Sequence, residues 1–217
     1  MLRARLIRPS SAWPDLYRDA AHTLGYSLHR RTARTYARRM RYADGPTATV
    51  EITIEAPPER VWELVTDITL PARLSPELRQ AEWLDGATGP TVGARFEGRN
   101  VHETVGEWRT HSRVEVLDAP TRFTWAVVSA RPDRNPDFTH PMATWSFALE
   151  PLADGTGTLL RQTARMGPAP SGVTPFIEKA PEHEEQIVAA RLGQLRTNIE
   201  ATLRGVKALA EERQTRP

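Results

Sequence analysis

The chain has 217 residues, of which 39% are hydrophobic, and its formal net charge is +2. This length is sufficient for one well-buried domain with residues left over. No apolar run approaches the ~18–20 residues that cross a bilayer, which argues against a transmembrane helix. The absence of cysteine excludes disulfides, thiolate metal ligands and a cysteine nucleophile, and a cytoplasmic location is expected.

Charge is distributed unevenly along the chain. Residues 1–46 contain ten arginines and three aspartates, a net charge of +7, whereas the remainder carries −5. A turn signal, Asp-Gly-Pro, ends the basic segment. We therefore expect a basic extension over 1–46, a domain over 47–212 and a short tail over 213–217. The mildly acidic domain argues against a nucleic-acid partner.

The basic extension has more than one interpretation. It is either a disordered tail or sequence upstream of a true start at Met40. The alternative is a real appendage, for example a basic helix that lies on a membrane surface.

The domain begins with a strand and two short helices. Residues 49–55 alternate between apolar and polar side chains, which is typical of a half-buried strand. The Ala-Pro-Pro sequence that follows ends the strand and opens a helix over 59–67. Pro71 and Pro76 then interrupt the helical pattern around a second short helix over 70–74.

The middle of the chain predicts six more strands. Turn residues such as Asp-Gly, Gly-Pro and Asp-Ala-Pro separate them, and no crossover of helix length lies between them. The arrangement therefore favours an antiparallel meander. The predicted strands are 78–85, 92–101, 104–117, 121–130, 142–151 and 157–166.

The last element is a long amphipathic helix over about 182–212. Its apolar residues recur every three or four positions and form one stripe, which must be buried against another element. The stripe includes Val188, Leu192, Leu195, Ile199, Leu203 and Val206.

Several segments in this order carry a family resemblance. They read IEAPPERVW from Ile54, SPE from Ser75, GARFEGRN from Gly93 and WSFALEP from Trp145. Over about residues 47–210 the chain resembles the SRPBCC (START-like) superfamily, in its polyketide cyclase/dehydrase-like and lipid-transport branch. The resemblance implies an α+β helix-grip fold. In this fold a curved antiparallel sheet of about seven strands wraps around a long C-terminal helix, with two short helices after the first strand and an internal cavity.

Alternate residues on the predicted strands face this cavity together with the helix stripe. Apolar walls with a few polar groups are typical of a small-molecule pocket. Alternatively, the aromatic residues at these positions simply fill the hydrophobic core. Likewise, the polar side chains could instead hydrogen-bond to a neighbouring strand or to an ordered water molecule. The residues we predict to bind a ligand are Phe96, Asn100, Trp108, Ser112, Trp125, Trp145, Phe147, Gln162, Leu195 and Ile199.

Two long loops are expected to gate the cavity, over 131–141 and 167–181. The second places Phe176 and Ile177 in an otherwise polar, proline-rich segment, which suggests an apolar tip at the cavity mouth.

The sequence contains no recognisable catalytic or metal-binding motif. His102, His111, His140 and His183 lie on different elements without ligand spacing, so we expect surface histidines, no metal and no cofactor. There is no Gly-x-Ser-x-Gly elbow. Catalytic residues are unknown, and His140 at the presumed mouth is the weak candidate for proton transfer.

These observations favour a carrier or binder of a hydrophobic small molecule, either a polyketide-like aromatic compound or a lipid. The alternative is a cyclase, aromatase or dehydratase that acts on a polyketide-like chain. A protein-interaction module ranks last, because the outward strand positions are mostly arginine, glutamate and threonine. The oligomeric state stays open.

Overall fold

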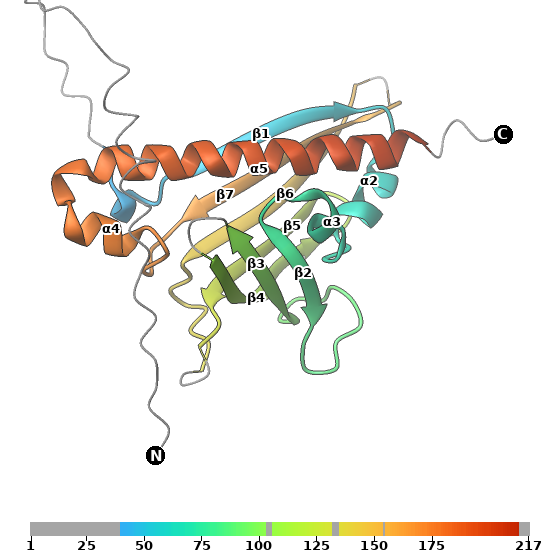
Figure 1. Ribbon diagram of the computed structural model, residues 1–217. Coiled ribbons are helices and arrows are strands. Elements are labelled where there is room, and N and C mark those ends of the chain that lie inside the picture. The colour runs from blue at the N-terminus through green and yellow to red at the C-terminus, as the bar shows by residue number, and fades with distance from the viewer. Residues whose placement is uncertain (1–39, 103–105, 132–134, 154, 213–217) are drawn as a thin grey trace, which may run out of the picture.

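The computed structural model describes residues 40–102, 106–131, 135–153 and 155–212. Their strands form one antiparallel sheet in the order β1-β7-β6-β5-β4-β3-β2, and a long helix, α5 (Glu184–Glu212), lies across it (Figure 1). The predicted α+β helix-grip fold is confirmed.

The first elements along the chain follow the sequence prediction closely. A short 3-10 helix, η1 (Tyr42–Asp44), precedes the strand β1 (Thr47–Ile54). Pro57 and Pro58 then start the helix α2 (Pro58–Val65), and α3 (Leu70–Leu74) follows. Proline suits a first helical turn because the missing N–H has no partner there in any case.

The remaining strands form the predicted meander, since each pairs with the next one along the chain. The last strand also pairs with β1, so that the first and last strands lie side by side. The bounds of these strands are β2 (Leu78–Trp83), β3 (Arg95–His102), β4 (Gly106–Asp118), β5 (Arg122–Ser129), β6 (Ala143–Pro151) and β7 (Thr158–Met166).

The register brings the predicted inward residues together on one face. Trp125 of β5 lies beside Trp145 of β6, and Phe147 lies beside Gln162 of β7. Neighbouring residues on paired strands point to the same side of a sheet, so these side chains share a wall.

The helix α5 packs mainly on β1 and α2. Its apolar stripe is buried, with Val188, Leu203 and Val206 each at most 1% exposed. The sheet curves away from the helix on the side of β2, β3 and β4 (Figure 1). One edge of the sheet therefore holds the helix, and the opposite part leaves room for a cavity.

Three details differ from, or add to, the sequence prediction. The segment 167–181, expected to be a loop, contains a short helix, α4 (Thr174–Lys179), followed by the 3-10 turn η2 (Pro181–His183). The long helix accordingly starts at Glu184. The described end of the basic extension lies against the domain, because Tyr42 is 8% exposed and belongs to the main core.

Among the described residues, no helix is both long enough and apolar enough to cross a membrane.

Candidate ligand-binding site

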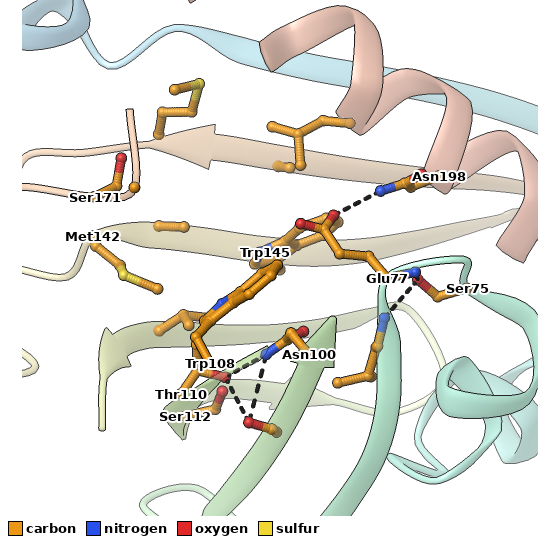
Figure 2. Close-up of a pocket in the computed structure, with 18 of the residues that line it drawn as sticks. Ser75, Glu77, Asn100, Trp108, Thr110, Ser112, Met142, Trp145, Ser171 and Asn198 are labelled. Carbon is orange, nitrogen blue, oxygen red and sulfur yellow. Dashed lines mark hydrogen bonds between the residues drawn. The ribbon is translucent and has the colours of Figure 1, made fainter. Parts of the chain in front are cut away.

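A cavity of about 670 Å³ lies between the curved sheet and α5. This volume is within the ~300–1,000 Å³ that small-molecule pockets occupy. Its walls come from β3 to β7, from the helix face around Leu195 and Ile199, and from the segment that leads into α4. Figure 2 shows part of this lining.

Aromatic rings form one continuous wall of the cavity. The rings of Trp125 and Trp145 stack almost in parallel, with centroids 6.3 Å apart and planes inclined by 9°. Phe147 lies 5.7 Å from Trp125, and Phe96 lies 6.5 Å from it on the other side. Together these rings present an aromatic, largely apolar surface to the cavity, which suits an apolar ligand.

A polar patch on β3 and β4 lies beside these rings. Nδ2 of Asn100 donates to the carbonyl of Gly98 and to Oγ1 of Thr110, both at 3.5 Å (Figure 2). Bonds of this length are weak, so the amide of Asn100 is free to bind a stronger partner. Ser112, 3% exposed, continues the patch along β4.

Gly98 allows this patch to pack closely. A Cβ at this position would lie 2.9 Å from Oγ1 of Thr110 and 3.2 Å from Cδ1 of Leu78. Any larger residue would therefore have to displace the threonine or the leucine.

The carboxylate of Glu77 is fixed between β2 and α5. Its Oε1 accepts a bond of 2.9 Å from Arg191, and its Oε2 accepts a bond of 2.7 Å from Asn198. The Glu77 side chain is 12% exposed and the Arg191 side chain 24%, which makes this a half-buried ion pair. Oγ of Ser75 accepts the backbone N–H of Glu77 and so fixes the start of the strand (Figure 2).

Gln162 is the most buried amide of the lining, at 5% exposed. Its Oε1 is fully buried and accepts no hydrogen bond within the described structure. Buried acceptors nearly always have a partner, so this atom is an exception that requires an explanation.

The exposed members of the lining mark the mouth of the cavity. They include Ser129 and Arg131, at the end of β5, and Pro170, Pro175 and Glu178 in and before α4. The ends of β5 and β7 and the start of β6 meet at this edge of the sheet. The cavity therefore opens between this edge and α4, and its other end is covered by Val65, Ile68 and Pro71.

A family model described as polyketide cyclase/dehydrase and lipid transport matches residues 45–211. The chain belongs to this family. The superfamily that the sequence motifs predicted is thereby confirmed. No match was found among curated proteins.

Solved structures of similar proteins agree with this assignment. A polyketide-cyclase-like protein from Corynebacterium glutamicum is 31% identical; the match covers 78% of this chain and 93% of that one, with a TM-score of 0.51. The Zhui aromatase/cyclase from Streptomyces sp. R1128 is 17% identical over 78% of this chain and 95% of its own, with a TM-score of 0.54. The di-domain aromatase/cyclase StfQ from the steffimycin pathway is 14% identical over 77% of this chain and 52% of its own, with a TM-score of 0.55. At these identities the two aromatase/cyclases share the fold.

All ten residues that we predicted from the strand and helix phases line this cavity of the polyketide cyclase/dehydrase fold. The structure thus brings together side chains from five strands and α5. Their role in binding a ligand stays a prediction. They are Phe96, Asn100, Trp108, Ser112, Trp125, Trp145, Phe147, Gln162, Leu195 and Ile199.

The predicted surface positions of the histidines hold for some of them and not for others. The expected surface position is wrong for His102, which is half-buried and lines the cavity, because it continues the inward phase of Phe96, Gly98 and Asn100 at the end of β3. His111 lies on the outer face, 3.5 Å from Glu97. Among the described residues, no group of histidine, aspartate and glutamate could hold a metal ion.

The predicted position of His140 at the cavity is wrong. Its side chain is 70% exposed, does not line the cavity and lies 3.3 Å from Asp137. Hydrogen bonds from Thr139 and His140 lower the pKa of Asp137 to about 2. The pair therefore stabilises the surface loop and is not a proton-transfer group of the cavity.

The two loops contribute unequally to the cavity. Of the described part of 131–141, only Arg131 lines it; Phe138 instead packs on Ala126 and Val128 on the outer face of the sheet, under the guanidinium of Arg113. The segment before and within α4 does line the cavity, through residues that include Pro170, Val173, Pro175 and Glu178. Phe176 and Ile177, expected at the mouth, pack against the core.

Sequence reasoning missed the Glu77 cluster. Glu77 and Arg191 are 114 positions apart, and a glutamate next to a proline at a strand start is ordinary in sequence. A usable signal existed on the helix: Arg191 and Asn198 lie seven positions apart, so two full turns place them on one face beside the apolar stripe.

Proposed function

We propose that this protein binds a hydrophobic small molecule, a polyketide-like aromatic compound or a lipid, in the cavity between the sheet and α5. The observation that carries the proposal is the aromatic wall of Phe96, Trp125, Trp145 and Phe147 inside a cavity of about 670 Å³. Membership of the polyketide cyclase/dehydrase and lipid transport family supports a role in ligand binding or cyclisation. The cytoplasmic location stays a prediction.

A fluorescent-dye titration tests the proposal. The neutral dye N-phenylnaphthylamine should bind the wild-type protein and become more fluorescent, because it moves from water into an apolar site. The variant Ala143→Phe places a ring among the lining residues near the mouth and should weaken binding by about tenfold or more, which corresponds to ~1.4 kcal/mol.

The matched control for this variant is Ala148→Phe. Ala148 lies five residues further along β6 and faces the opposite side of the sheet, beside Arg122 and Arg161. It should bind the dye as the wild type does. A wild-type protein that takes up no apolar dye, or equal effects of the two variants, would contradict a ligand cavity at this place.

A cyclase-type enzyme is the second candidate, and the position of His102 favours it. An imidazole that lines the cavity provides a group that can donate or accept a proton. Under this alternative, a bound polyketide-like chain should be recovered as a cyclised or dehydrated product, and His102→Gln should abolish that change while dye binding persists. Recovery of the ligand unchanged would favour the binder.

A further inference from the structure

We infer that the ligand of this cavity is elongated and carries an uncharged hydroxyl group at one end, which donates a hydrogen bond to Oδ1 of Asn100 beside the ring of Trp108. The inference rests on the proposed function and narrows its ligand class to hydroxylated hydrophobic compounds. It makes Asn100 a residue that selects ligands by a hydrogen-bond donor.

Asn100 presents an unused acceptor. Its Nδ2 faces the carbonyl oxygen of Gly98 and Oγ1 of Thr110. A carbonyl oxygen can only accept a hydrogen bond, so this contact determines which way the amide is turned and directs Oδ1 away from the two bonds (Figure 2). Within the described structure, Oδ1 accepts no hydrogen bond.

A ligand in the cavity can reach this acceptor. Among the described residues, the side-chain polar atoms that are both fully buried and unpartnered belong to Arg60 and Gln162. Asn100 is half-buried and lines the cavity, and its unpartnered Oδ1 is not one of these atoms, so it has accessible surface. Oε1 of Gln162 has none, so Asn100 and not Gln162 is the amide that a ligand can contact.

Trp108 lies beside Asn100 and offers free aromatic surface. The two residues are opposite each other across the β3–β4 pair. Trp125 and Trp145 pack on the core and on each other, whereas Trp108, although half-buried, packs neither on the core nor on another ring within the described structure. An apolar ring face next to a hydrogen-bond acceptor suits an apolar molecule that carries a hydroxyl group.

The register places this pair at the mouth end of the cavity. Thr110, two residues further along β4 than Trp108, lies opposite Ser129, which is at the mouth. Phe96 of the aromatic wall lies four residues from Asn100 along β3, roughly 13 Å at about 3.3 Å per residue. A ligand that contacts both positions is therefore elongated, with its apolar part on the rings and its hydroxyl group toward the mouth.

The charges at this end of the cavity favour an uncharged donor. Arg131 and Arg191 both line it. The carboxylate of Glu77 is already bonded to Arg191, and Glu178 belongs to α4 on the other side of the mouth. An ammonium group at Asn100 would lose part of its hydration without a free carboxylate beside it, whereas a hydroxyl group needs only one acceptor.

Three probes that share a hexyl chain test the inference: 4-hexylphenol, 4-hexylanisole and hexylbenzene, each used to displace N-phenylnaphthylamine. The phenol has a donor, the anisole keeps the oxygen without the donor, and hexylbenzene has neither. The measured quantity is the ratio of the Kd of 4-hexylanisole to the Kd of 4-hexylphenol. This ratio is compared between variants and the wild type, so the different hydration of the free probes cancels.

Asn100→Leu should lower this ratio roughly two- to tenfold, the loss expected for one hydrogen bond. The variant should bind hexylbenzene at least as tightly as the wild type does, which would show that its cavity is intact. The matched control, Arg99→Leu, makes the same replacement one residue earlier on the outer face of β3, where Arg99 pairs with Glu82 and Glu97. It should leave the ratio unchanged.

Trp145→Ala tests where the apolar part of the ligand lies. The variant should weaken the binding of all three probes by similar factors, because the ring of Trp145 contacts the part that they share. The ratio should stay that of the wild type, since the donor is bound elsewhere.

The outcomes separate this inference from the proposed function. A wild type that binds the dye but has the same ratio as Asn100→Leu overturns the inference and leaves the proposed function standing. An equal fall of the ratio in Arg99→Leu also overturns it, because that side chain lies outside the cavity. A wild type that binds neither the dye nor any probe overturns both.

Discussion

The aromatic residues of the wall differ in how completely protein atoms alone bury them. Phe123 and Phe147 are 2% and 1% exposed, so they are packed on all sides although they border the cavity. Trp145 is only partly buried, because one side of its ring stacks on Trp125 and another borders the cavity. A ligand is therefore expected to complete the packing of Trp145, whereas the two phenylalanines need none.

This difference gives a prediction for Trp145→Ala. Its loss of stability should fall below the ~3–5 kcal/mol that is usual for truncating a fully packed large aromatic residue. Binding of N-phenylnaphthylamine should weaken, by about three- to tenfold, because a stacking partner worth ~0.5–1.5 kcal/mol is lost.

The comparison variant for Trp145→Ala is Leu203→Ala. Leu203 is 1% exposed and does not line the cavity, so its truncation should cost about 2–5 kcal/mol and leave the dye affinity unchanged. Thermal melting and dye titration measure both variants. Strong destabilisation by Trp145→Ala with unaltered dye binding would mean that Trp145 is a core residue.

Between elements, the sheet edge at β2 is joined to α5 in two ways: by the side chain of Glu77 and by the short helix α3, which packs against both. The helix packs mainly on β1, at the opposite edge of the sheet, and on α2. Glu77, at the start of β2, reaches Arg191 and Asn198 of the helix. This cluster therefore ties the far edge of the curved sheet to the helix across the cavity.

Glu77→Gln tests this tie. The variant keeps a bond to Asn198 but leaves the half-buried Arg191 without its counter-charge. We expect a loss of about 1–3 kcal/mol, between the values for exposed and buried ion pairs. Amide hydrogen exchange should also become faster in α3 and β2.

The control for Glu77→Gln is Arg204→Gln, which breaks the ion pair with Glu200 on the exposed face of the same helix. Pairs of this kind contribute at most about 1 kcal/mol, and this one should leave exchange in β2 unaltered. Identical melting of the two variants would show that Glu77 does not hold the edge.

The sequence predicted the elements well where a local pattern determined them. Alternation between turns located the strands, and the inward phase located the aromatic wall, because side-chain direction in a strand has a strict period of two. The helix α4 escaped prediction because six residues that include Pro175 are too few for a periodic signal. The Glu77 cluster and the burial of Gln162 depend on contacts between distant segments, which periodicity alone does not locate.

For the whole molecule, the described residues before β1 are part of the folded domain. Tyr42 is 8% exposed; its hydroxyl donates to the carbonyl of Ala169 at 2.7 Å, and its N–H donates to Glu184 at 2.9 Å. Burial raises the pKa of this hydroxyl, so it remains a donor at neutral pH. Tyr42 thus joins the N-terminal side of the domain to the segment before α4 and to the start of α5.

Two shortened chains test where the domain begins. A chain of residues 40–217 keeps Tyr42 and should melt within about 2 °C of the full chain, a shift that corresponds to less than ~1 kcal/mol. It should also bind N-phenylnaphthylamine with the same affinity, because every residue that lines the cavity is retained.

A chain of residues 47–217, which follows the boundary expected from charge, loses the buried ring of Tyr42 and both of its hydrogen bonds. We expect it to be less stable by about 2.5–4 kcal/mol, the sum of ~1.5–3 kcal/mol for burial and ~1 kcal/mol for hydrogen bonding. Its dye affinity should fall as well, because the segment before α4 that borders the mouth loses its bond at Ala169. Thermal melting and dye titration of the three chains decide the matter. Equal stability of the two shortened chains would show that Tyr42 contributes nothing to the fold, and a large loss in the 40–217 chain would show that residues 1–39 stabilise the domain.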